Sequence, residues 1–123
     1  MRGNNTYRDL IVWQKSMDLV EEVYRLTRLL PDEERYALSL QMRRSVVSIP
    51  SNIAEGQSRK GDKEFLNFLS YAIGSKSELE TQLLICCKLD YFSEKEIEKS
   101  MSLCDEISKM IYAITDKLEK IRE

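Results

Sequence analysis

Five basic residues are the clearest candidates for chemistry in this sequence of 123 residues, and the chemistry that suits them is phosphate binding. Arg43 and Arg44 are adjacent in a predicted helix, and Arg59, Lys60 and Lys63 follow in and after the next loop. Because a helix and the loop after it lead the next helix back alongside, we expect the two groups to converge. Arginine presents a planar fork of donors that matches a phosphate group. The pattern therefore predicts weak, salt-dependent binding of RNA or DNA.

The distribution of charge leaves two other uses for these arginines open. The net charge is only −2, but residues 1–60 carry +2 and include eight arginines, whereas the remaining residues carry −4. A pI of 5.4 argues against a polycation that coats nucleic acid. Arg43 and Arg44 can instead pair with glutamates such as Glu55 within the chain, or with acidic groups across a subunit interface.

Other reactive chemistry finds little support in the sequence. The chain contains no histidine, which removes histidine-based acid–base catalysis and most zinc and di-iron sites. Cys86, Cys87 and Cys104 lack the spacing of a metal site and are expected to be small buried hydrophobes. Glu78 and Glu80 are two residues apart, so they face different sides of a helix and form no catalytic pair. We expect no enzymatic activity, no cofactor and no metal.

The N-terminus and the cysteines predict a cytoplasmic protein without a membrane partner. No apolar run precedes Leu10, so no signal peptide is expected, and no window approaches the roughly 18 apolar residues of a membrane span. An odd number of cysteines in such a chain indicates reduced thiols inside a cell.

Helical spacing of apolar residues defines the elements that must position the basic groups. Four segments show it, at roughly 9–30, 33–56, 62–89 and 93–121, within a single domain of residues 1–123. Short connections between four amphipathic helices predict an all-α fold, an antiparallel up-down four-helix bundle. Gly56 is expected to end the second helix and the pair Gly74-Ser75 to mark a close helix contact, while Ser93 and Glu96 form a capping box.

The first two helices carry more apolar surface than one core needs. Each shows two apolar stripes, which is typical of a helix that also meets another subunit; a helix fully buried in the monomer is the alternative. The predicted oligomer interface comprises Trp13, Tyr36, Leu40, Arg43, Val47, Pro50 and Asn52.

Several runs of sequence resemble the bacterial 23S rRNA intervening-sequence proteins, a family of four-helix bundles. The resemblance is carried by Asp9–Met17, Val23–Thr27, Gln41–Gly56 and Gly74–Leu83, and covers roughly residues 9–92. Two residues depart from the family pattern: Ala37 and Asp90 stand where glycine is usual.

The resemblance implies a left-handed bundle that assembles into a homo-oligomeric ring, a pentamer, without enzymatic activity. It also implies a similarity to accessory proteins of diversity-generating retroelements, which bind nucleic acid and partner a reverse transcriptase. Our leading hypothesis is a non-enzymatic homo-oligomer that binds RNA or another nucleic acid weakly. The alternative is a protein–protein assembly module that binds no nucleic acid.

Overall fold

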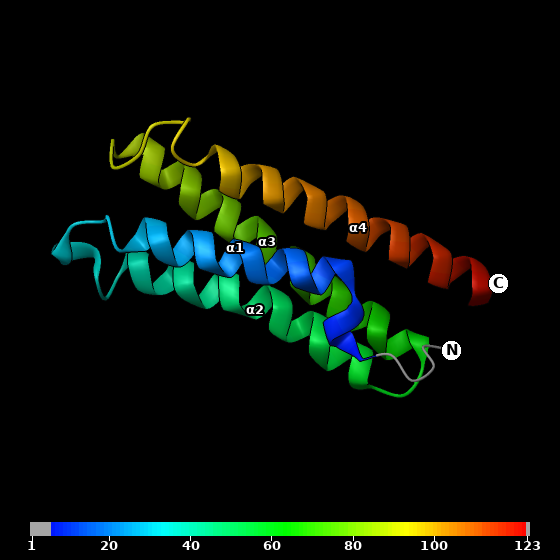
Figure 1. The fold of residues 1–123 in the computed structure, drawn as a ribbon. Helices are drawn as coiled ribbons and strands as arrows, with labels where there is room; N and C mark the ends of the chain where they lie inside the picture. The colour runs from blue at the N-terminus through cyan, green and yellow to red at the C-terminus, as the bar shows by residue number, and fades with distance from the viewer. Residues whose placement is uncertain (1–5, 123) are drawn as a thin grey trace.

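All four predicted helices form, and each runs antiparallel to the next along the chain (Figure 1). The computed structural model describes residues 6–122. The helices are α1 (Ile11–Thr27), α2 (Leu38–Ser58), α3 (Asp62–Lys88) and α4 (Glu98–Arg122). Short 3-10 turns, η1 (Tyr7–Asp9) and η2 (Asp32–Glu34), precede α1 and α2. The predicted all-α four-helix bundle is confirmed.

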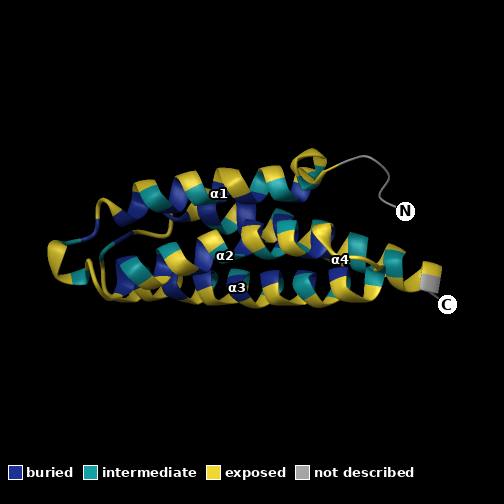
Figure 2. Cartoon of the chain, turned by 90° about the horizontal axis from the view of Figure 1, so that it is seen from below, coloured by how far each residue is buried: buried dark blue, intermediate teal, exposed yellow. Residues whose placement is uncertain are grey.

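The core is built from one apolar stripe of each helix, which faces inward (Figure 2). On α2 one of the two apolar stripes is buried in full, and its members are Leu38, Met42, Val46, Ile49 and Ile53. On α1 and just after it the buried stripe is Val12, Leu19, Val23, Leu26 and Leu30. Burial of one apolar face stabilises an amphipathic helix, and the structure shows which of the two stripes is buried on each helix.

Two helices begin later than predicted, because turns occupy the residues before them. α2 begins at Leu38 rather than near residue 33, since η2 and the turn after it take up residues 32–37. α4 begins at Glu98 rather than at residue 93. The predicted capping box does form: the Ser93 amide donates to Glu96 Oε1 at 2.8 Å, and the Glu96 amide to Ser93 Oγ at 3.2 Å. It closes a turn that leads into α4.

Small residues let α2 and α3 pack closely together. A Cβ atom on Gly56 would lie 2.6 Å from Phe68 Cβ, and Ser48 Oγ lies 2.8 Å from Ser75 Oγ across the two helices. Gly56 does not end α2, as the sequence had suggested, because the helix continues to Ser58. The close contact predicted at Gly74-Ser75 is confirmed through Ser75, whereas a Cβ on Gly74 would meet nothing within 4 Å.

The two tight turns that follow α2 and α3 use left-handed backbone. Gly61 has φ of 87° immediately before α3, a conformation that glycine adopts without steric cost. Asp90 has φ of 63° at the end of α3, where the Asp90 amide donates to the Cys87 carbonyl at 3.0 Å. Aspartate tolerates this conformation better than most residues other than glycine and asparagine, because its short polar side chain can form local hydrogen bonds.

Candidate functional site

A partly apolar surface lies along α1 and α2. Trp13, Val20 and Tyr24 of α1 are half-buried, Met17 is exposed, and on α2 Val47 is 40% exposed. Arg43 of α2 lies beside Tyr24 of α1, and two antiparallel helices of equal rise therefore place Val20 near the level of Val47 and Trp13 near that of Ala54. We call this the α1–α2 surface; it comprises Trp13, Met17, Val20, Tyr24, Leu40, Val47 and Ala54.

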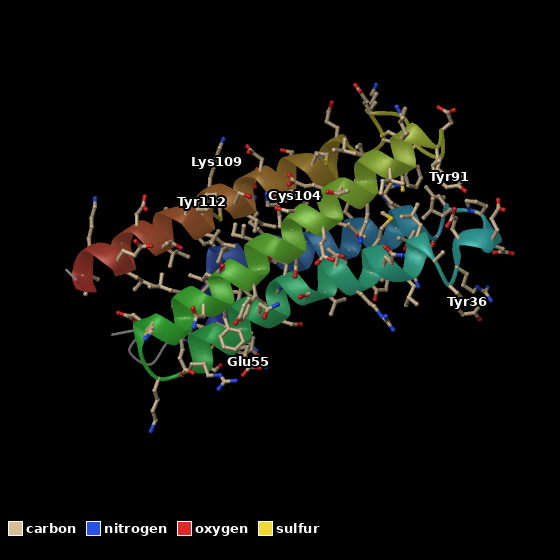
Figure 3. The ribbon with its side chains drawn as sticks, turned by 180° about the vertical axis from the view of Figure 1, so that it is seen from behind. Tyr36, Glu55, Tyr91, Cys104, Lys109 and Tyr112 are labelled. Carbon is tan, nitrogen blue, oxygen red and sulfur yellow. The ribbon has the colours of Figure 1, made fainter. Side chains whose placement is uncertain are left out.

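Only part of the predicted oligomer interface lies on this surface. Trp13, Leu40 and Val47 belong to it, and Arg43 lies between its two helices. Tyr36 is 82% exposed and precedes α2, at the opposite end of that helix from Glu55 (Figure 3).

Two other predicted interface residues are placed differently. Pro50 is buried within the chain, inside α2. Asn52 is half-buried, and its amide donates to the carbonyl and the Oγ of Ser48, one turn earlier on α2, each at 2.8 Å. Both residues therefore contribute to packing within the bundle.

Arg43 and Arg44 are adjacent but lie in different grooves. Arg43 faces α1: its Nε donates to Thr27 Oγ1 at 2.9 Å, and its guanidinium carbon lies 4.5 Å from the centre of the Tyr24 ring. Both contacts hold the side chain in place, since a cation over an aromatic face is attracted to the ring. Arg44 lines a polar groove of about 400 Å³ between α2 and α3, together with Ser75, Glu78 and Gln82.

The other three predicted basic residues form a separate cluster at the turn between α2 and α3. Arg59 follows α2, Lys60 lies in the turn, and Lys63 is in the first turn of α3. Fifteen residues separate Arg44 from Arg59, which at 1.5 Å per residue is about 22 Å along the helix. The fold therefore does not bring the five residues together into one patch.

The predicted ion pair between the α2 arginines and Glu55 does not form. Glu55 accepts from Arg59 instead, with Nη2 and Nε of the arginine 3.0 and 3.2 Å from its Oε2. Within residues 6–122, neither Arg43 nor Arg44 makes an ion pair with an acidic side chain.

Arg25 shows what a fully paired arginine looks like in this protein. It makes two hydrogen bonds to the buried Glu22, at 2.9 and 2.7 Å. These bonds hold the pKa of the Glu22 carboxyl below its usual value. Unlike Arg25, the α2 residues Arg43 and Arg44 are not neutralised by an acidic side chain of the described chain, so their charges can interact with a binding partner.

The sequence prediction missed two arginines that lie close to Arg43. Arg28, just after α1, and Arg35, just after η2, line one cavity with Arg43; its volume is about 280 Å³. The remaining lining residues are Thr27, Leu30, Pro31, Asp32 and Ser39. The enrichment of arginine before residue 60 was the available signal, but only the path of the chain through η2 shows which arginines meet.

The cysteines are thiols that stay protonated. Cys86 and Cys104 are buried, as predicted, and burial raises the pKa of Cys86 to about 11 and that of Cys104 to about 12. Cys87 is half-buried, and burial raises its pKa as well. In the described part of the chain, no three His, Cys, Asp or Glu side chains are grouped so as to hold a metal ion.

Comparison with known proteins places the chain in a family. Residues 8–113 match the family of the 23S rRNA-intervening sequence protein. The chain belongs to this family. A crystal structure of a protein of unknown function from the S23 ribosomal protein family of Bacteroides thetaiotaomicron is similar, with a TM-score of 0.78 and 27% identity over 85% of this chain and 97% of that one. No curated protein matches this member of the 23S rRNA-intervening sequence proteins.

Within residues 6–122, no helix is both long enough and apolar enough to cross a membrane.

Proposed function

We propose that this protein is a non-enzymatic homo-oligomer that binds RNA, or another nucleic acid, weakly through its α2 arginines. The observation that carries the proposal is that Arg43 and Arg44 have no acidic partner among the described residues. Guanidinium groups on a helix surface bind phosphate through paired, charge-assisted hydrogen bonds. The name of the family, which refers to a sequence within 23S rRNA, favours RNA as the nucleic acid.

The cluster at the α2–α3 turn would form a second, weaker contact. Lys60 and Lys63 are exposed there. Arg59 also contributes, although its charge is shared with Glu55. Since the two groups lie about 22 Å apart along α2, one extended nucleic acid can touch both, whereas a compact ligand cannot.

An assembly module without nucleic-acid binding is the competing function, and the α1–α2 surface supports it. Val47 and Met17 are exposed there beside half-buried aromatic side chains. In that case Arg43 and Arg44 would pair with acidic groups of a neighbouring subunit. A pentamer is the assembly that the family resemblance suggests.

A salt titration of RNA binding distinguishes the two functions. The logarithm of the association constant for single-stranded RNA falls with the logarithm of salt concentration, with a slope of about −0.7 per phosphate contact. We expect the double variant Arg43→Gln, Arg44→Gln to lose two contacts, so its slope becomes shallower by about 1.4.

The control for this titration is Lys109→Gln. It removes one positive charge that already pairs with Asp105 on α4, at 3.0 Å. Its slope should equal that of the wild type. RNA affinity that does not change with salt, or a double variant that binds like the wild type, would exclude phosphate contacts by these arginines. If the double variant instead loses the oligomer, the intersubunit ion pairs are favoured.

A further inference from the structure

We propose that the cavity between the end of α1, η2 and the start of α2 binds one phosphate group of a phosphomonoester, held by Arg28, Arg35 and Arg43. The proposal rests on the proposed function only in that the end of a nucleic acid is the expected source of this group. Beyond a general attraction for phosphate, the proposal names the pocket that binds and a preference for phosphomonoesters over phosphodiesters.

The charge of the cavity suits a dianion. Three guanidinium groups and one carboxylate, Asp32, line it. Among residues 6–122, none of the three arginines is held in an ion pair. The net excess of two positive charges matches a phosphomonoester, which carries about −1.5 to −2 at pH 7. A phosphodiester inside a nucleic-acid strand carries only one negative charge per phosphate and would neutralise the pocket less completely.

Two contacts already hold the Arg43 side chain in one orientation. Its Nε donates a hydrogen bond to Thr27 Oγ1, and its guanidinium group packs over the Tyr24 ring. Thr27 is itself fixed, since its hydroxyl donates to the Tyr24 carbonyl at 3.0 Å. The terminal nitrogens of the guanidinium are the donors that these contacts leave for a ligand. Binding therefore orders little that is not ordered already, which reduces its entropic cost.

The start of α2 borders the same cavity. Ser39 lies in the first turn of this 21-residue helix and is among the lining residues. The Leu38 amide of that turn already donates to Glu34 Oε1 at 3.3 Å, so the contribution of α2 to the cavity is the positive end of its dipole, which favours an anion beside it. The arginines and the start of α2 thus favour an anion in the same volume.

The cavity has room for a phosphate group, and its polar groups favour that part of a ligand. Its volume of about 280 Å³ is just below the range of about 300–1,000 Å³ that holds drug-sized ligands. Leu30 and Pro31 form part of its wall and offer no side-chain hydrogen bonds to a sugar or base. The contacts that the cavity offers are therefore mainly to the phosphate group and not to the rest of a phosphorylated molecule.

The test compares a short RNA that carries a 5′-phosphate with the same RNA ending in a 5′-hydroxyl, with inorganic phosphate as a third probe. We expect the wild type to bind the phosphorylated RNA about tenfold more tightly, the effect of one charge-assisted contact. Arg43→Gln should abolish the preference, whereas Arg8→Gln, which removes the same charge at the far end of α1, should keep it.

Inorganic phosphate separates this proposal from the proposed function and also identifies the source of the phosphate. If both RNAs bind equally and phosphate does not raise the thermal midpoint of the wild type, the pocket is excluded while RNA binding stands. If neither RNA binds but phosphate raises that midpoint and not that of Arg43→Gln, RNA binding is excluded, the pocket stands, and free phosphate is its ligand.

The variant Arg43→Lys distinguishes a loss of phosphate binding from a loss of folding. Lysine keeps the charge on a slightly shorter side chain but lacks the planar fork and the Nε–H group that donates to Thr27. We expect this variant to retain the helical circular dichroism of the wild type and to show a weaker preference for the 5′-phosphate. Full preference in a folded Arg43→Lys protein would contradict the role of the fork.

Discussion

Tyr91 connects two turns that lie far apart in the sequence. Its hydroxyl donates to Glu34 Oε2 at 2.7 Å, so the turn after α3 is tied to η2 beside the arginine-lined cavity. This hydrogen bond raises the pKa of Tyr91 to about 12, because the phenol must keep its proton to donate. The hydrogen bond could not be predicted, since nothing in the sequence indicates that residues 57 positions apart meet.

Replacement of Tyr91 should change the alkaline titration of the protein. A phenol whose pKa is raised by folding, from 10.0 to about 12, stabilises the fold below pH 10, and this contribution is lost as the pH rises through 12. We expect the absorbance titration of Tyr91→Phe to lack one phenol ionisation near pH 12. Between pH 10 and 12, the free energy of unfolding of this variant should also fall less than that of the wild type. Identical titration curves would contradict the hydrogen bond.

Some properties of the arginine site could be predicted from the sequence, whereas others depend on the three-dimensional course of the chain. Adjacent residues on a helix differ by about 100° in direction, so Arg43 and Arg44 had to face different grooves once the core stripe was fixed. That much was predictable from the sequence. The meeting of Arg43 with Arg28 and Arg35 was not, because it depends on the course of residues 28–37 between α1 and α2.

At the scale of the elements, the packing of α2 on α3 depends on Gly56. We expect Gly56→Ala to destabilise the protein by about 1–3 kcal/mol, the usual cost of forcing an extra atom into a packed contact. The added Cβ would lie 2.6 Å from Phe68 Cβ and 3.1 Å from Phe65 Cδ1, and a Cβ atom cannot rotate away. Thermal unfolding followed by circular dichroism measures the change.

Gly74→Ala is the matched control for this experiment. It places the same methyl group within α3, where a Cβ meets nothing within 4 Å. Alanine in an exposed helical position is more favourable than glycine by about 0.5–1 kcal/mol, so this variant should be more stable than the wild type. If both variants shift the midpoint in the same direction, the close approach at Gly56 is not the cause.

The two glycines also show how far the sequence could predict the elements. The number and order of the helices follow from apolar spacing, but on α2 this spacing leaves two apolar stripes and does not show which one is buried. The close contact at Gly56 was missed, because the composition of a helix does not show which of its faces touches a neighbour. The starts of α2 and α4 were misplaced for a related reason: turns at residues 32–37 and 93–97 have the polar, acidic composition of a first helical turn.

At the scale of the whole molecule, the α1–α2 surface predicts where subunits would meet. We expect Val47→Glu to reduce the molar mass measured by light scattering toward that of a monomer, because it places a charge at the centre of this surface. Ile85→Glu on α3 is the matched control, since both side chains are 40% exposed. It should leave the mass unchanged. The opposite pattern would move the interface to α3, and a wild type that is monomeric would exclude the assembly.

The tight contact between α2 and α3 has a consequence for the order of folding. Only residues 59–61 separate these two helices, so the chain closes a very short loop to bring them together. Proteins dominated by such local contacts fold quickly, and the pair with the shortest connection loses the least entropy when it forms. We therefore expect the α2–α3 hairpin to form first, with α1 and α4 docking onto it later. In that order the cavity lined by arginine would be among the last features to be completed, since it requires α1 and η2 to be in place.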